Sequence, residues 1–273
     1  MCPYRSPPVV SHPLIDRATN EPPGTASEPP SQKSFWTSTT MSARTRSRYR
    51  AESAAGEDAG RGGGEKRNMA DYWNHNVYYQ PLILGAVPPG CGSALDVGCG
   101  DGLLACRLAE RCRDVTGVDR DRVLIAAARE RAKDLRNVAF IDAEFPAFPF
   151  EDGSFDFIAS NTAIHHMNFE AALMAMARLL RPGGRLAIIG IARSARARDY
   201  VPDLMAVPLN LGLELTHAAL RAAHREDRAP RYPIKDPTMT WGEVRIGALR
   251  LLPGVHYRRH LLWRYSLMWR KPA

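Results

Sequence analysis

The sequence lacks paired cysteine motifs and long hydrophobic runs, and each absence excludes a class of protein. Its most apolar run, Leu186–Ala192, is far shorter than the roughly 18–20 residues of a membrane-spanning helix, and prolines interrupt the N-terminus. The five cysteines contain no C-x-x-C pair and no flanking histidine cluster, which argues against a disulfide framework or a zinc site. We therefore predict a cytoplasmic protein with reduced thiols, no membrane segment and no bound metal.

The chain also lacks a strong charge imbalance. It carries 37 Lys and Arg against 29 Asp and Glu, a formal net charge of +8 over 273 residues. The excess is spread along the chain, because the first 68 residues contribute +3 and the remainder +5. A balance of this size raises the expectation of an anionic partner only slightly and does not by itself indicate a nucleic-acid-binding protein.

The composition divides the chain into two parts. Residues 1–68 are rich in Pro, Ser, Thr, Arg and Gly, and eight of the 21 prolines fall within the first 30 positions. Such a segment buries too little apolar surface to offset the entropy lost on ordering. We predict a disordered tail over 1–68, or an over-long translation start, followed by one folded domain over 69–273.

Strand and helix patterns alternate within the predicted domain. Strands are expected at 94–97, 115–118, 138–141, 155–160 and 186–191, and helices at 103–112, 121–134, 169–180 and 240–252. Asn168 is the expected N-cap of the third helix, and Thr240 with Glu243 forms a capping box at the start of the last. This alternation predicts a parallel sheet with helices on both faces. Two closing strand-like runs, at 255–260 and 265–269, predict an antiparallel hairpin. Residues 193–239 fit no regular pattern beyond a helix near 211–224, and we assign them to a substrate-pocket insertion.

A glycine-rich loop follows the first predicted strand. Gly98, Gly100 and Gly102 alternate with other residues, and a helix begins directly after them. Glycine lets the backbone approach a ligand closely, and the N-terminus of the helix offers free N–H groups. The loop predicts a nucleotide-type cofactor at the end of this strand. Leu103 stands where the dinucleotide fingerprint requires its third glycine, which argues against NAD.

Three aspartates lie at or near the ends of the first three predicted strands. Asp96, just before the glycine loop, can pair with an ammonium group. Asp119 can accept both hydrogen bonds from a ribose diol, and Asp142 can accept one from an exocyclic amine. A ligand with an amino-acid end, a ribose and an adenine would satisfy all three.

Four motifs give the domain a family resemblance. In chain order they are LDVGCGDG, VTGVDRD, IDAEFPAFPFEDGSFD and LLRPGGRLAII, and together they resemble class I S-adenosylmethionine-dependent methyltransferases from about Met69 to Ala273. The resemblance implies an α/β, Rossmann-like, doubly wound, mostly parallel sheet of seven strands in the order 3-2-1-4-5-7-6, with an antiparallel C-terminal strand. It also implies S-adenosyl-L-methionine as the cofactor.

The resemblance also implies roles for individual residues. Gly98, Gly100 and Gly102 would wrap the methionine part, Asp119 would bind the ribose hydroxyls and Asp142 would lie near the adenine amine. We assign the following further residues to the same cofactor site: Asp96, Cys99, Arg120, Ala143 and Asn161.

Two more groups of residues are candidates for the acceptor side. His165 and His166 follow the fourth strand, where an imidazole can take a proton from an attacking hydroxyl or amine, or can simply pack within the loop. Tyr72, His75 and Tyr79 have the spacing of one helix face and either line the substrate pocket or form an aromatic core stripe.

Three functions remain open, of which methyl transfer to an O, N or C atom of a small molecule is favoured. An RNA- or protein-modifying methyltransferase is the second, but Ser160-Asn161-Thr162-Ala163 replaces the Asn/Asp-Pro-Pro-aromatic signature of many base-amine enzymes. The third is a non-catalytic cofactor-binding partner protein, against which the intact glycine loop argues. The sequence does not specify the oligomeric state.

Overall fold

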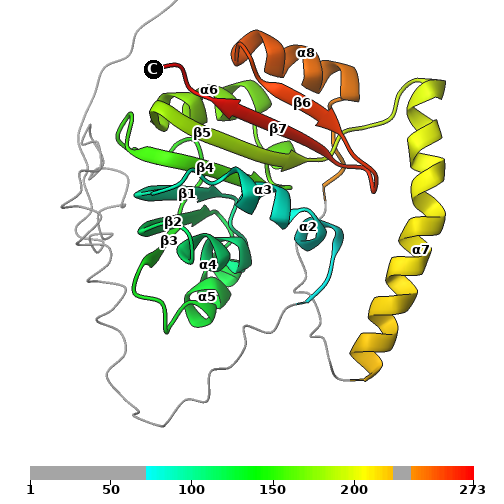
Figure 1. Cartoon of the computed structure of the whole chain (residues 1–273), viewed down its shortest axis with the longest axis horizontal. Coiled ribbons are helices and arrows are strands. Elements are labelled where there is room, and N and C mark those ends of the chain that lie inside the picture. Colours follow the sequence, from blue (N-terminus) through cyan, green and yellow to red (C-terminus); the bar gives the residue numbers. More distant parts are fainter. Residues whose placement is uncertain (1–71, 224–234) are drawn as a thin grey trace, which may run out of the picture. The chain divides into compact units, whose positions relative to one another are not determined.

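The computed structural model of the chain describes residues 72–223 and 235–273, so the predicted tail over 1–68 lies outside the described residues. Seven strands form one sheet in the order β3-β2-β1-β4-β5-β7-β6 (Figure 1). The strands are β1 (Ser93–Val97), β2 (Asp114–Asp119), β3 (Val138–Asp142), β4 (Phe155–Asn161), β5 (Leu180–Gly190), β6 (His256–Arg259) and β7 (Tyr265–Arg270). The predicted strand order and the antiparallel pairing of β7 with β5 are confirmed.

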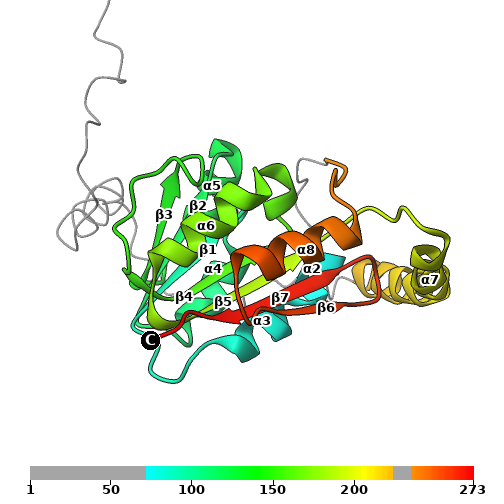
Figure 2. The same ribbon diagram turned by 90° about the horizontal axis from the view of Figure 1, so that it is seen from above.

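Helices cover both faces of the sheet. The first face carries α3 (Gln80–Ala86), α4 (Leu103–Ala109) and α5 (Arg122–Arg131), and the second carries α6 (Phe169–Leu179) and α8 (Trp241–Leu251). Figure 2 shows α6 and α8 on the opposite side of the strands from α3. Each face of the sheet has its own hydrophobic core, and successive side chains of β1 point into one core or the other. Leu95 and Val97 pack toward α6, while Ala94 packs toward α4. No helix within 72–223 or 235–273 has the length and apolar character to cross a membrane.

The parallel register brings the predicted ligand residues to one edge. Val97 lies opposite Val118, and Asp119 lies opposite Asp142, so the carboxyl ends of β1, β2 and β3 coincide. On the side away from β2, β1 pairs with β4, which also runs parallel to it. Loops that leave these four strands therefore surround a common space, as expected for an open α/β sheet.

Several predicted boundaries are wrong. The helices α4 and α5 end at Ala109 and Arg131, before the predicted Cys112 and Asp134. The strand β5 begins at Leu180 rather than Leu186, because Leu180 already pairs with Phe155 of β4. The helix within the predicted insertion, α7 (Tyr200–Ala222), begins well before the predicted Leu211.

The predicted N-terminal helix face through Tyr72, His75 and Tyr79 is also wrong. Two short helices replace it, α2 (His75–Tyr78) and α3, which meet at Tyr79. The side chain of Asn74 caps α2 by accepting hydrogen bonds from the N–H groups of Asn76 and Val77, each at 2.9 Å. Because Asn74 stops the helix from extending backward, Tyr72 lies outside it.

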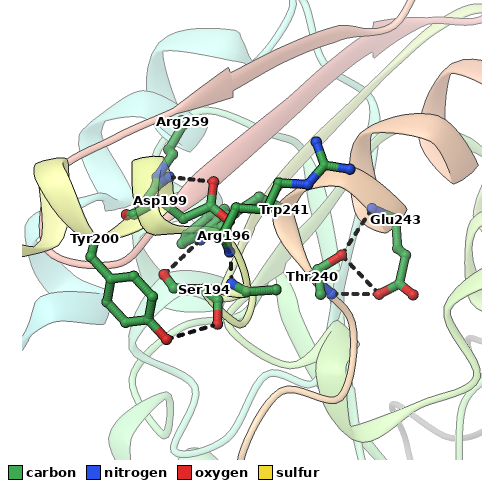
Figure 3. A network of polar contacts seen from close by, with 9 residues as sticks. Ser194, Arg196, Asp199, Tyr200, Thr240, Trp241, Glu243 and Arg259 are labelled. Atoms are coloured by element: carbon green, nitrogen blue, oxygen red, sulfur yellow. Dashed lines mark hydrogen bonds and ion pairs between the residues drawn. The ribbon is translucent and has the colours of Figure 1, made fainter.

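A polar network holds the start of α7 against α8 and β6 (Figure 3). The guanidinium of Arg259 lies over the ring of Trp241 at 4.1 Å and 3.7 Å from the carboxylate of Asp199, which closes the 3₁₀ turn η3 (Ala197–Asp199). The indole N–H of Trp241 donates to the hydroxyl of Ser194 at 3.0 Å. The predicted capping box of Thr240 with Glu243 opens α8 beside this network and is confirmed.

Candidate functional site

A cavity of about 650 Å³ lies at the carboxyl edge of β1, β2 and β4. Its volume is within the range of pockets that bind small-molecule ligands. Most of the residues predicted from the sequence for this site line it: Tyr72, Asp96, Gly98, Cys99, Gly100, Asp119, Arg120, Ala143, Asn161, His165 and His166. The structure therefore brings together residues from the predicted cofactor, catalytic and substrate groups.

Two residues predicted for the cofactor site are not in the cavity wall. Gly102 begins α4 with φ +77°, and a Cβ on it would lie 2.7 Å from Phe140 and 2.8 Å from Ala128. This glycine lets the helix pack closely on the sheet. The carboxylate of Asp142 pairs with Arg122 at 2.9 Å. The ligand contacts of Gly102 and Asp142 stay predictions.

Two of the three predicted substrate-pocket aromatics also lie outside the wall. His75 Nε2 forms a 2.5 Å hydrogen bond with Asn210 Oδ1 of α7. Tyr79 is buried, and its hydroxyl donates to the carbonyl of Leu261 at 2.6 Å. These two side chains tie the N-terminal helices to α7 and to the C-terminal hairpin, while Tyr72 lines the cavity.

Asp96 is the most unusual acid of the cavity. Its side chain is 1% exposed, and neither carboxylate oxygen has a hydrogen-bond partner within the described residues. Burial, with the nearby charges of Asp119 and Asp101, raises the pKa of Asp96 to about 8. The backbone N–H of Ala105 offsets this only in part and forms no hydrogen bond with Asp96, so a cation would stabilise the ionised carboxylate. The α-ammonium group of an amino-acid ligand therefore fits this position.

The glycine loop and Asp119 form the next part of the wall. Gly98 has φ +70°, and a Cβ on it would lie 2.1 Å from that of Ala163, so no side chain fits there. The two carboxylate oxygens of Asp119 accept hydrogen bonds from the N–H groups of Gly100 at 3.0 Å and Asp121 at 2.9 Å. Each oxygen keeps a second acceptor position for the hydroxyls of a ribose.

Tyr72 contacts Asp101, a residue of the glycine loop for which the sequence predicted no role. The buried hydroxyl of Tyr72 donates to Asp101 Oδ1 at 3.0 Å. Asp101 Oδ2 accepts from Arg131 Nη2 at 2.6 Å, and Arg131 lies 5.8 Å from the centre of the Tyr72 ring. This contact fixes the segment before α2 over the cofactor loop.

The two histidines lie in the 3₁₀ turn η2 (Ile164–His166) after β4, with ring centroids 4.1 Å apart. Burial, followed by the positive charges of His166, Arg264 and Lys235, lowers the pKa of His165 to about 4. Burial and the charge of Arg120 also lower the pKa of His166. Both imidazoles are therefore mainly neutral near pH 7 and can accept a proton.

Several lining residues were missed by sequence reasoning, most notably Arg264. Its Nη2 donates to Asn76 Oδ1 at 2.8 Å, and Asn161 Nδ2 donates to the Asn76 carbonyl at 3.0 Å. Arg264 lies in the connection between β6 and β7, far in sequence from every motif. No local pattern indicates that this connection reaches the cavity.

Comparisons with known proteins agree with this geometry. Residues 95–188 match a family model described as a methyltransferase domain. Uncharacterised methyltransferases of Mycobacterium tuberculosis and Mycobacterium bovis are 35% identical over 214 residues, which cover 75% of this chain and 100% of theirs. A Ribosomal protein L11 methyltransferase of Burkholderia mallei is 34% identical over 133 residues, covering 48% of this chain and 41% of its own.

The fold has a counterpart among solved structures. The PH0226 protein of Pyrococcus horikoshii OT3 aligns with a TM-score of 0.52 and 20% identity, covering 71% of this chain and 88% of that one. Together with the family match, these likenesses show that the chain belongs to the class I S-adenosylmethionine-dependent methyltransferases. Its cofactor is S-adenosyl-L-methionine.

Proposed function

We propose that the protein methylates an O, N or C nucleophile of a small-molecule acceptor. One observation carries this proposal: most of the predicted cofactor residues, Asp96 and Asp119 among them, and both loop histidines line a single cavity. Tyr72 and Asn76 from the N-terminal segment and Arg264 from the hairpin complete its wall. A pocket lined by the edge of the sheet, the N-terminal segment and the hairpin suits a small molecule better than the surface of a macromolecule.

The lining residues suggest how the chain would perform the reaction. S-adenosylmethionine supplies a methyl group on a sulfonium, which is an electrophile with a good leaving group. Asp96 would hold its ammonium and Asp119 its ribose, while Gly98 leaves room for the backbone to approach. Fixing the reactants in line can supply roughly 7–11 kcal/mol of the barrier. A neutral His165 or His166 would take the proton of a hydroxyl or amine acceptor.

A histidine substitution separates binding from chemistry. We expect His166→Gln to leave the dissociation constant of S-adenosylhomocysteine nearly unchanged and to lower kcat, since a general base contributes about 10²–10⁴-fold. His165→Gln is the matched variant, because the two rings are neighbours. Calorimetry and steady-state kinetics measure the two quantities. Full turnover in both variants would assign the histidines to packing and leave catalysis to positioning alone.

The acceptor class is tested with methyl-labelled cofactor. We expect label to enter a low-molecular-weight metabolite extract and not total RNA or protein. Label in RNA or protein would replace the small-molecule proposal by a macromolecular one. Tight cofactor binding with no transfer to any fraction would indicate a non-catalytic binding protein.

The proposal includes a cytoplasmic location. It is supported by Cys91, Cys99, Cys106 and Cys112, which are all buried free thiols, as expected in a reducing compartment.

A further inference from the structure

The acidic residues of the cavity lie on one side of it. They all lie within or directly after β1, β2 and β3, and include Asp96, Asp101 and Asp119. Arg120 and Arg122 line the same side, next to Asp119. The other side is lined by Arg264, Lys235 and the histidines of η2. Among the described residues that line the cavity from α2, from the loop after β4 and from the hairpin, none is acidic.

Arg264 has no ionic partner in the part of the chain that the structure describes. Its Nη1 donates to the carbonyl of Leu262 at 3.2 Å and its Nη2 to the amide oxygen of Asn76 at 2.8 Å, while its Nε is buried without an acceptor. Burial lowers the pKa of Arg264 to about 10, so the guanidinium still carries its charge at pH 7. A guanidinium has five N–H donors, and therefore donors remain for a ligand.

The hairpin is shaped to hold Arg264 in the cavity wall. Leu262 and Trp263 both adopt positive φ, +55° and +58°, which side-chain-bearing residues rarely do. Leu262 is fully buried, and Tyr79 binds the carbonyl of Leu261. A strained turn persists only where surrounding contacts impose it, and such turns concentrate at functional sites.

We propose that the methyl acceptor carries an anionic group, such as a carboxylate, which Arg264 binds with the help of Lys235. A half-buried cation without a counter-charge loses part of its hydration, and an anionic ligand supplies that charge. Arginine presents paired donors that match the geometry of a carboxylate. This inference rests on the proposed small-molecule function and specifies its acceptor.

The binding of an anion here would also affect the neighbouring base. Burial is the largest cause of the low pKa of His165, and the charges of His166, Arg264 and Lys235 lower it further. An acceptor anion bound by Arg264 would offset only the part that comes from Arg264 and Lys235, so the pKa of His165 would rise while burial still holds it below its usual value.

The cofactor has a carboxylate of its own, which is the competing source of an anion. The contacts of Arg264 favour the acceptor: it donates to the amide oxygen of Asn76 in α2, and its charge contributes to the low pKa of His165. The pKa of Asp96, by contrast, is raised by burial and by the charges of Asp119 and Asp101. Arg264 thus belongs to the histidine side of the cavity rather than to the ammonium side.

The first experiment separates these two sources. We expect Arg264→Gln to keep the dissociation constant of S-adenosylhomocysteine within about threefold of the unaltered protein, by calorimetry. Arg258→Gln is the matched control, because Arg258 is an exposed arginine of β6 outside the cavity. A loss of about tenfold or more in Arg264→Gln alone would assign the guanidinium to the cofactor and overturn the proposal.

The second experiment tests anion binding without turnover. Protein saturated with S-adenosylhomocysteine is titrated with benzoate and with neutral benzamide, observed by ligand NMR. We expect benzoate to bind the unaltered protein and the Arg258→Gln variant equally well, and to bind Arg264→Gln about tenfold more weakly. The affinity for benzoate should recover partly in Arg264→Lys. Benzamide should not distinguish the variants. Equal benzoate binding with and without Arg264, or no benzoate binding at all, contradicts the proposal.

The third experiment identifies the charge of the acceptor. A metabolite extract is divided on an anion exchanger at pH 7 before incubation with methyl-labelled cofactor. We expect the label in the retained, anionic fraction, and its loss with Arg264→Gln. Label only in the unretained fraction overturns the anionic acceptor while the small-molecule function stands. Label only in RNA or protein contradicts the proposed function itself.

Discussion

The carboxyl group of Asp96 makes the stability of the protein depend on pH. Its pKa rises from 3.8 to about 8 on folding. Between these values the folded state binds a proton that the unfolded state has lost, so the free energy of unfolding falls as pH rises. Each pKa unit corresponds to about 1.4 kcal/mol.

Asp96→Asn should therefore remove this fall of the free energy of unfolding with pH, which we call the pH slope. Without ligand, we expect the variant to exceed the unaltered protein in stability at pH 8 by at least about 1.4 kcal/mol, and by much less at pH 4. Urea denaturation at both pH values measures the difference. Asp134→Asn, which removes an exposed acid, is the control and should keep the slope. The same slope in all three proteins would show that Asp96 ionises normally.

Asp119 should control cofactor affinity. Asp119→Ala removes the acceptor of the predicted ribose hydrogen bonds and the partner of the Gly100 N–H, so affinity for S-adenosylhomocysteine should fall at least about tenfold. The kcat at saturating cofactor should fall much less, because the ribose is remote from the methyl group. Asp114→Ala, at the opposite end of β2, should bind within about twofold of the unaltered protein. Equal affinities for both variants would refute the ribose assignment.

At the residue scale, the sequence predicts site residues where residues adjacent in the chain form the site. The glycine loop and Asp119 follow directly from strand ends, and the structure places Gly98, Gly100 and Asp119 in the cavity. Arg264 could not be predicted, because it reaches the cavity through a turn whose positive φ values at Leu262 and Trp263 have no sequence signature. Tertiary contacts, not local preference, determine that turn.

At the element scale, the cap of α8 offers a test of local stabilisation. The hydroxyl of Thr240 accepts from the N–H of Glu243, whose carboxylate in turn accepts from the Thr240 N–H at 2.7 Å. Thr240→Ala should lower the free energy of unfolding by about 0.5–2 kcal/mol. Thr216→Ala in exposed α7 should change it by less than about 0.5 kcal/mol. Denaturant titration measures both, and no difference between them would mean that the cap does not stabilise α8.

Elements whose ends depend on their own side chains were predictable. The cap of Asn168 on α6 and the capping box of α8 are confirmed. Elements whose ends depend on distant partners were not, since β5 begins early because its Leu180 pairs with Phe155 of β4. The N-terminal helix was predicted wrongly for another reason: the cap of Asn74 and the proline at position 81 are local signals that helical spacing overlooks. Spacing alone does not contain these contacts.

At the scale of the whole molecule, composition predicts that residues 1–68 are dispensable. A chain beginning at Met69 should keep the melting temperature and the affinity for S-adenosylhomocysteine. A chain beginning at His75 is the contrast, because it lacks Tyr72, which binds Asp101, and Asn74, which caps α2. It should lose affinity. Thermal unfolding and calorimetry compare the full chain with the two shortened chains. A large loss of melting temperature or affinity in the chain that begins at Met69 would show that residues 1–68 contribute to the domain.

The acids at the ends of β1 and β2 also make the stability of the protein depend on its cofactor. Without a cationic ligand, burial and the charges of Asp119 and Asp101 disfavour the ionised form of Asp96, whose carboxyl group therefore keeps its proton. A ligand that binds only the folded state adds about 2.7 kcal/mol of stability at a hundredfold excess over its dissociation constant. Depletion of S-adenosylmethionine should therefore lower the free energy of unfolding of this enzyme, by an amount set by the ratio of the cofactor concentration to its dissociation constant.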